Sequence, residues 1–213
     1  MKYIKIFEQF DDNIIPSQLI DVIKDSLKIN INKLLGCGKF GCAFKIDNNK
    51  VLKISTDLKE YEYAKKLKGI RNKHIADIYD VYYIEYNNEK YVIIIKEYCL
   101  LESNNINKKI ESFEKYSFGD MTLTYLSSEF LHGDISLHKF KSYFDEYEKN
   151  EGTYDLSEWY YMIMELRKHK IYVKDLDENN IGYKVYNGKK SLCIIDLGLG
   201  YWNNINFKKE DEL

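Results

Sequence analysis

The sequence feature that most constrains the fold is a glycine-rich turn, Gly36-Cys37-Gly38-Lys39-Phe40-Gly41, between two strand-like runs. In a Rossmann unit, GxGxxG follows a strand, opens a helix and leads to an acidic residue about 20 positions on. Here the following run, 42–46, alternates as a strand does. The motif therefore predicts a strand–turn–strand hairpin whose glycines let backbone amides approach phosphate groups. An ordinary hairpin with glycines for turn geometry is the alternative.

The first half of the chain is predicted to be rich in β-structure. Strand-like runs occupy 29–35, 42–46, 50–54, 78–85 and 90–97, with turn signals at 47–50 and 86–89. A helix is predicted at about 57–68, with Thr56 or Asp57 as its N-cap. A shorter helix opens at Pro16-Ser17, and we assign it to an N-terminal extension, residues 1–28.

The second half has a different pattern. Residues 101–153 are polar and are predicted to form helices and loops. An amphipathic helix is expected at 155–169, and short strands at 181–185 and 192–195 flank a turn at Asn187-Gly188. We therefore predict an α+β, bilobed fold. An antiparallel five-stranded sheet plus one helix would form the N-terminal lobe, 29–99. A mostly α lobe, 100–213, would carry the insert 101–153.

Composition excludes several classes of protein. The 213 residues are 45% hydrophobic and 31% charged, which is typical of a globular domain with a core. A net charge of −2 gives no basic field for nucleic acid or anionic membrane. No apolar run approaches the ~20 residues that span a bilayer. Cys37, Cys42, Cys99 and Cys193 form no CxxC pair and no zinc spacing, so we expect reduced thiols and a cytoplasmic protein.

A lysine, Lys53, lies in the otherwise apolar run Val51–Ile54. A buried ammonium group is costly unless it is paired. Lys53 either faces solvent or pairs with a carboxylate on the following helix, where it could hold phosphate groups. Glu60 is the first candidate partner, since apolar residues follow it three, four and seven positions later. Glu62 is the alternative.

Two further segments carry oxygen ligands. Asp175 and Asn180 are five residues apart in a turn-rich segment after the amphipathic helix. Asp196 ends an apolar strand and is followed by Leu197-Gly198. Carboxylate and amide oxygens suit magnesium, which fills the rest of its shell with water and phosphate.

In this order and spacing, the features resemble the protein-kinase-like superfamily over about residues 29–200. The resemblance implies a bilobed fold that binds ATP and Mg²⁺. Asp175 would orient or deprotonate an acceptor hydroxyl, and Asn180 and Asp196 would bind magnesium. Lys53, paired with Glu60, would position the phosphates.

The resemblance also assigns the nucleotide contacts. Gly36, Gly38 and Gly41 would cover the phosphates. The adenine would be lined by Leu35, Ala43 and Val51, and it would be hydrogen-bonded by backbone groups near Glu97 and Cys99. The implied activity is phosphate transfer from ATP to a protein Ser, Thr or Tyr.

The chain departs from the family pattern at several positions. Val173 and Lys174 replace the His and Arg before the catalytic Asp, and Asp177 replaces a lysine that helps to neutralise the γ-phosphate. Lys96 lies at or beside the usually apolar gatekeeper position. A second segment, Leu131-His132-Gly133-Asp134, resembles the H-G-D loop of aminoglycoside phosphotransferases but has Lys139 where Asn is needed. We do not expect that segment to be catalytic.

The largest departure is that only fifteen residues follow Gly198, which leaves no room for a long activation segment or the usual peptide platform. We therefore expect a minimal, truncated kinase-like chain. The insert 101–153, or a second copy in a homodimer, is a candidate to supply the missing part. The partner would be a protein substrate, with no nucleic acid and no membrane. The alternative is a pseudokinase or kinase-shaped module that acts by binding a partner protein.

Overall fold

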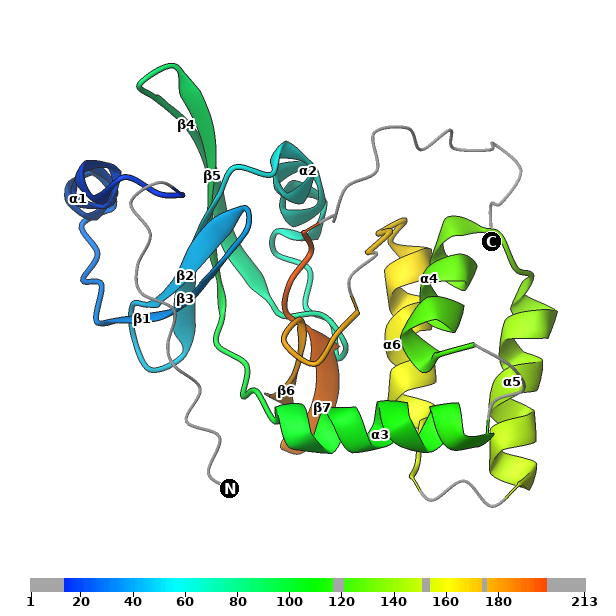
Figure 1. Ribbon diagram of the computed structural model, residues 1–213. Helices are drawn as coiled ribbons and strands as arrows, with labels where there is room; N and C mark the ends of the chain where they lie inside the picture. The colour runs from blue at the N-terminus through cyan, green and yellow to red at the C-terminus, as the bar shows by residue number, and fades with distance from the viewer. Residues whose placement is uncertain (1–13, 117–120, 151–153, 174–175, 199–213) are drawn as a thin grey trace. The chain divides into compact units, whose positions relative to one another are not determined.

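The computed structural model describes residues 14–116, 121–150, 154–173 and 176–198 (Figure 1). The chain divides into two compact units. The first unit is Met1–Arg71 with Asp77–Tyr98, and the second is Asn72–Ala76 with Cys99–Leu213. Within the described ranges, no helix combines the length and the apolar character that crossing a bilayer requires.

The first unit is built on a five-stranded antiparallel sheet in the order β1-β2-β3-β5-β4. The strands are β1 (Lys33–Gly38), β2 (Gly41–Lys45), β3 (Lys50–Ser55), β4 (Ile78–Tyr86) and β5 (Glu89–Glu97). The β4–β5 turn contains Asn87 and Asn88, both with positive φ, as a two-residue hairpin turn of matching twist requires. All five predicted strands are present.

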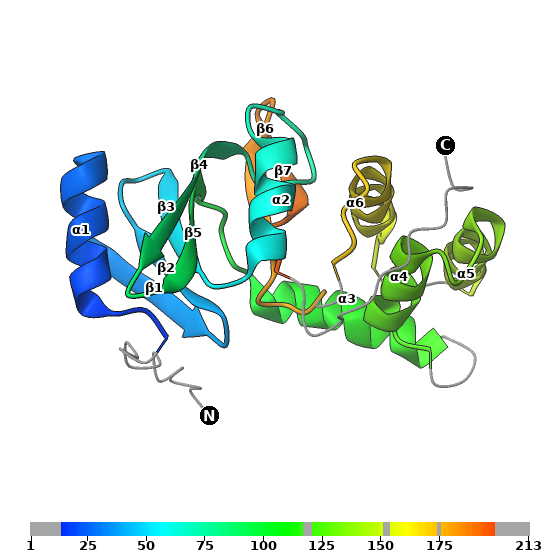
Figure 2. The same ribbon diagram turned by 90° about the horizontal axis from the view of Figure 1, so that it is seen from above.

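Two helices lie on opposite sides of this sheet (Figure 2). Helix α1 (Ser17–Leu27) buries Leu19, Ile20 and Ile23 in one apolar core with alternate residues of the central strands. Those residues are Cys42 and Phe44 of β2, Ile46 directly after it, Leu52 and Ile54 of β3, and Tyr91, Ile93 and Ile95 of β5. Because strand side chains alternate, the residues between them point to the side of α2 (Leu58–Leu67). The Asp57 carboxylate caps α2 by accepting from the Lys59 N–H at 2.9 Å.

The described residues of the second unit form four helices and one hairpin. The helices are α3 (Ser103–Tyr116), α4 (Leu123–His132), α5 (Leu137–Lys149) and α6 (Ser157–Lys168), and the hairpin strands are β6 (Ile181–Tyr186) and β7 (Lys189–Ile194). Helix α4 contacts α3, α5 and α6. The buried Trp159 indole donates to the Ser127 hydroxyl at 2.9 Å, which links α6 to α4. The predicted α+β class, with a helical second part, is confirmed.

The segment Asn72–Ala76 belongs to the second unit, although residues of the first unit precede and follow it. Its backbone pairs with β7, with Ile194 N–H donating to His74 O and Ala76 N–H donating to Ile194 O, both at 3.0 Å. The buried His74 ring contacts the Leu192 carbonyl at 2.9 Å. Burial lowers the pKa of His74 from its ordinary value, and the hydrogen bond to Leu192 opposes that shift in part.

Candidate functional site

The glycine-rich turn forms a tight hairpin between β1 and β2, as predicted. Gly38 pairs with Gly41, so that Lys39 and Phe40 form the tip. A Cβ added at Gly36 or Gly38 would meet open space, whereas one at Gly41 would collide with the Ile54 carbonyl of β3. Gly41 is therefore needed for strand packing, and the other two glycines leave free space beside the loop.

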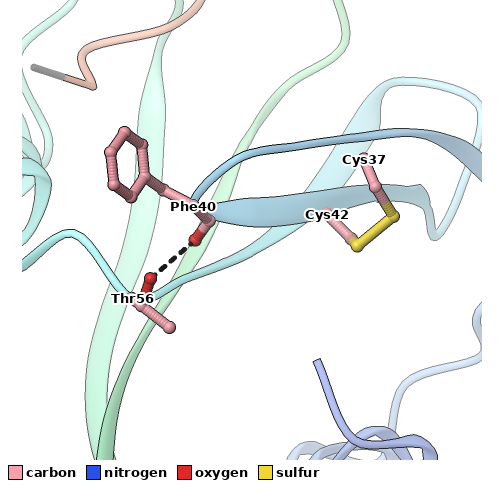
Figure 3. The surroundings of a disulfide bond; sticks show 4 residues. All are labelled: Cys37, Phe40, Cys42 and Thr56. Carbon is pink, nitrogen blue, oxygen red and sulfur yellow. Dashed lines mark hydrogen bonds between the residues drawn. A yellow bond between two sulfur atoms is a disulfide. The ribbon is translucent and has the colours of Figure 1, made fainter. Parts of the chain in front are cut away.

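The tip of this loop is held by the residue that follows β3. The carbonyl of Phe40 accepts from the Thr56 backbone N–H at 2.7 Å and from the Thr56 hydroxyl at 3.1 Å (Figure 3). Both donors lie beyond the end of β3, so that they tie the tip to the strand that carries Lys53.

A disulfide joins Cys37 and Cys42 across the base of the same loop (Figure 3). The expectation of reduced thiols is therefore wrong for this pair, while Cys99 and Cys193 are buried thiols outside any disulfide. The reason is the hairpin register. Cys37 and Cys42 are cross-strand partners, which places their side chains on the same face of the sheet. Cys37 and Cys42 are five residues apart, which is not a CxxC spacing, and the hairpin register brings them together.

Lys53 and Glu60 form an ion pair, with Lys53 Nζ 2.7 Å from Glu60 Oε1. The Lys53 side chain is 12% exposed and that of Glu60 is 1% exposed. Of the two candidate partners, Glu60 makes the contact, and Glu62 is exposed on the other side of α2. This arrangement follows from the α2 register, since Tyr63, Ala64 and Leu67 are buried on the same helix face.

The predicted adenine-lining residues of β2 and β3 share a sheet face with Lys53. Ala43 is the direct cross-strand partner of Lys53, and Val51, two residues before Lys53, is the partner of the buried Lys96. This face thus carries two lysines next to small apolar side chains. Leu35 is half-buried at an irregularity of β1, between Leu34 and Gly36.

The two linker positions predicted to hold adenine fall in different units. Glu97 ends β5 in the first unit, where its N–H donates to the Asp77 carbonyl at 2.8 Å and its carboxylate accepts from the Asp77 N–H. Cys99 begins the continuous part of the second unit, and its thiol lies 3.4 Å from that of Cys193. The backbone of Leu100 then pairs with Tyr183 of β6.

The structure brings the two predicted magnesium ligands next to each other in the second unit. The Asn180 carbonyl accepts from the Ile195 N–H at 2.8 Å and from the Asp196 N–H at 3.3 Å. The β6–β7 hairpin between them returns the chain through Asn187 and Gly188, both with positive φ. The side chains of Asn180 and Asp196 are half-buried. Asn180 offers an amide oxygen, and Asp196 offers a carboxylate. That chemistry fits magnesium.

Asp177 has a structural role that the sequence analysis missed. Its carboxylate accepts from the backbone N–H groups of Asn179 at 2.8 Å and Asn180 at 3.1 Å. The resulting turn fixes the backbone from which the Asn180 side chain projects. An aspartate followed two residues later by asparagine in a loop is the available sequence signal for such a turn.

Asp175, the predicted catalytic residue, and Lys174 lie outside the described residues. The H-G-D segment ends α4, where Gly133 adopts a positive φ and its N–H caps the helix. The segment is therefore the C-terminal end of a helix. Among the described residues, no group of three His, Cys, Asp or Glu side chains could hold a metal ion.

Comparison with known proteins gives structural neighbours only. No protein-family model matches the chain, and no curated protein matches its sequence. Among solved structures, the chain is similar to a MAP kinase from Leishmania major, with 12% identity and a TM-score of 0.41 over 87% of this chain. The chain spans about half the length of that kinase, since the match covers 51% of it.

Proposed function

We propose that this protein is an ATP- and Mg²⁺-dependent phosphotransferase whose acceptor is a hydroxyl group of a protein. The glycine-rich loop and Lys53 would hold the phosphates, and Asn180 and Asp196 would hold magnesium. Asp175 would accept the proton of the acceptor hydroxyl. The proposal rests on the residues of the chain itself and on their spacing.

The observation that carries the proposal is the Lys53–Glu60 pair. Burying two opposite charges costs desolvation energy that their attraction offsets only in part, so such a pair is weak evidence for a purely structural role. The ion pair gives Lys53 a fixed position on the sheet face where Ala43 lies between it and Gly36 in the strand register. This is what orientation of a polyphosphate requires.

The second unit supports the metal-binding part of the proposal. Asn180 and Asp196 flank the 14-residue hairpin Ile181–Ile194, yet the Asp196 N–H donates to the Asn180 carbonyl. When bound, magnesium would neutralise charge on the phosphates. The chain's contribution is to fix the two ligands, through the Asp177 turn at Asn180 and through the Gly198 N–H, which donates to the Asp196 carboxylate at 2.9 Å.

The test is transfer of phosphate from labelled ATP to the protein itself and to proteins of a cell lysate. Wild type is expected to transfer phosphate in Mg²⁺, and Asp175→Ala is expected to lower the rate at least about a hundredfold while leaving ATP binding intact. Glu178→Ala, a neighbouring half-buried carboxylate, is the matched control and should retain activity.

Two outcomes would contradict this proposal. Wild type that transfers no phosphate but is stabilised by Mg-ATP would indicate a nucleotide-binding pseudokinase. Equal transfer by wild type and Asp175→Ala would show that the activity does not use the predicted loop.

A further inference from the structure

All four cysteines of the chain occur in two pairs, one in each unit. Cys37 and Cys42 are bonded in the glycine-rich loop, whereas Cys99 and Cys193 are thiols whose sulfur atoms lie 3.4 Å apart. Three of the four are buried, with exposed fractions of 1% for Cys42, 6% for Cys99 and 0% for Cys193. Cys37 alone is half-buried. Of the two bonded residues, Cys37 is therefore the more accessible to an external thiol.

We propose that the Cys37–Cys42 disulfide is a thiol-exchange site that sets the order of the glycine-rich loop. A small dithiol attacks Sγ of Cys37 as a thiolate, and the Cys37–Cys42 bond breaks. The electron pair of that bond leaves on Cys42, which takes up a proton. The second thiol of the reductant then releases Cys37 and closes a cyclic disulfide. Two electrons pass to the protein, and the dithiol is oxidised.

The position of the bond explains why its reduction would loosen the loop. It joins the residues that flank the Gly38–Gly41 pair, so that it encloses the whole tip. Gly36 and Gly38 carry no side chain that could restrain the backbone. The disulfide and the Thr56 contacts to Phe40 both restrain the tip, in addition to the backbone pairing of β1 with β2. Reduction removes the disulfide and leaves the other contacts.

The bond lies on the opposite face of the sheet from Lys53. Cys42 belongs to the apolar core under α1, and Cys37 packs against that core, whereas Lys53 belongs to the other face. Reduction therefore leaves the Lys53–Glu60 pair in place and changes the backbone of the loop. If the proposed function holds, the bonded form has a preorganised loop and binds nucleotide more tightly, by about threefold to tenfold.

The primary test does not depend on nucleotide. The full chain is purified under oxidising conditions, and its intact mass and alkylated peptides are measured before and after treatment with dithiothreitol. We expect a Cys37–Cys42 bond before treatment. Afterwards, under native conditions, iodoacetamide should label Cys37 while the buried Cys99 and Cys193 stay unlabelled. Four free thiols in the oxidised sample would overturn the proposal.

The order of the glycine-rich loop is measured by the rate of limited trypsin cleavage after Lys39, which is exposed at the loop tip. Reduction of wild type should accelerate this cleavage at least about fivefold, because cleavage needs local opening of the hairpin. Cys37→Ser should be cleaved at the fast rate with or without dithiol. Thr56→Ala, which removes the hydroxyl hydrogen bond to Phe40 but keeps the one from the backbone N–H, should still respond to dithiol. Equal rates for oxidised and reduced wild type would overturn the proposal, whatever the result of the ATP experiments.

Discussion

Lys53 Nζ lies 2.7 Å from Glu60 Oε1, and the helix and the strand that carry these groups shield both from water. The first testable consequence concerns Glu60→Gln, which keeps the shape of the side chain but removes its charge. We expect a loss of unfolding free energy on the order of 3 kcal/mol, since Lys53 then lacks a charged partner. Phosphate transfer should fall at least about tenfold. Glu62→Gln on the same helix is the control and should change neither quantity. Urea denaturation and labelled ATP measure the two effects.

The glycines of the loop should respond differently to the same substitution. Gly41→Ala places a Cβ against the Ile54 carbonyl and should cost at least about 2 kcal/mol of stability. In Gly38→Ala, the added Cβ meets open space in the protein without nucleotide. The melting temperature of this variant should therefore stay near that of wild type, while its affinity for ATP falls. If both variants lost equal stability, the loop would not have the packing described.

Asp177 should matter through its hydrogen bonds. Asp177→Ala leaves the N–H groups of Asn179 and Asn180 without their carboxylate acceptor, and we expect a loss of about 1 kcal/mol. Asp177→Asn retains a side-chain oxygen and should lose less. Chemical denaturation of Asp177→Ala and Asp177→Asn separates the loss of the hydrogen-bond acceptor from the loss of the negative charge. Greater stability of the Ala variant would contradict the assignment.

Some of this site could be predicted from the sequence because it depends on local patterns. The helix register favoured Glu60 over Glu62 as the partner of Lys53, although it left the choice open and did not exclude a solvent-facing Lys53. The Asn180–Asp196 neighbourhood follows from a hairpin with an Asn-Gly turn. These are periodicities of two and 3.6 residues that remain visible in a single sequence.

Other features depend on contacts that no local pattern encodes. His74 meets Leu192 across 118 residues, and its segment reads as an ordinary loop between α2 and β4. The disulfide needs the register of β1 against β2, which a search for cysteine spacings does not include. The helices between 103 and 149 were expected only as helices and loops, because their strongly polar composition obscures their buried faces.

His74 predicts a pH dependence of stability. Because burial lowers its folded-state pKa below the ordinary value of 6.5, the unfolded chain takes up a proton at a higher pH than the folded chain does. The stability that neutral His74 contributes is present above pH 6.5 and is lost as the pH falls toward the folded-state pKa. His74→Gln should flatten the melting temperature between pH 7.5 and 5.5, relative to wild type. His138→Gln, at an exposed site, should not.

The most direct test of the central claim is calorimetric titration with ATP, with and without Mg²⁺, of wild type, Asp196→Asn and Lys53→Met. We predict that wild type binds ATP and that Mg²⁺ tightens binding at least about tenfold. Asp196→Asn should retain Mg²⁺-free binding and lose most of the Mg²⁺ effect, and Lys53→Met should weaken binding in both conditions. Wild type that binds no ATP, or binds it with the same affinity in all three forms, would contradict the account.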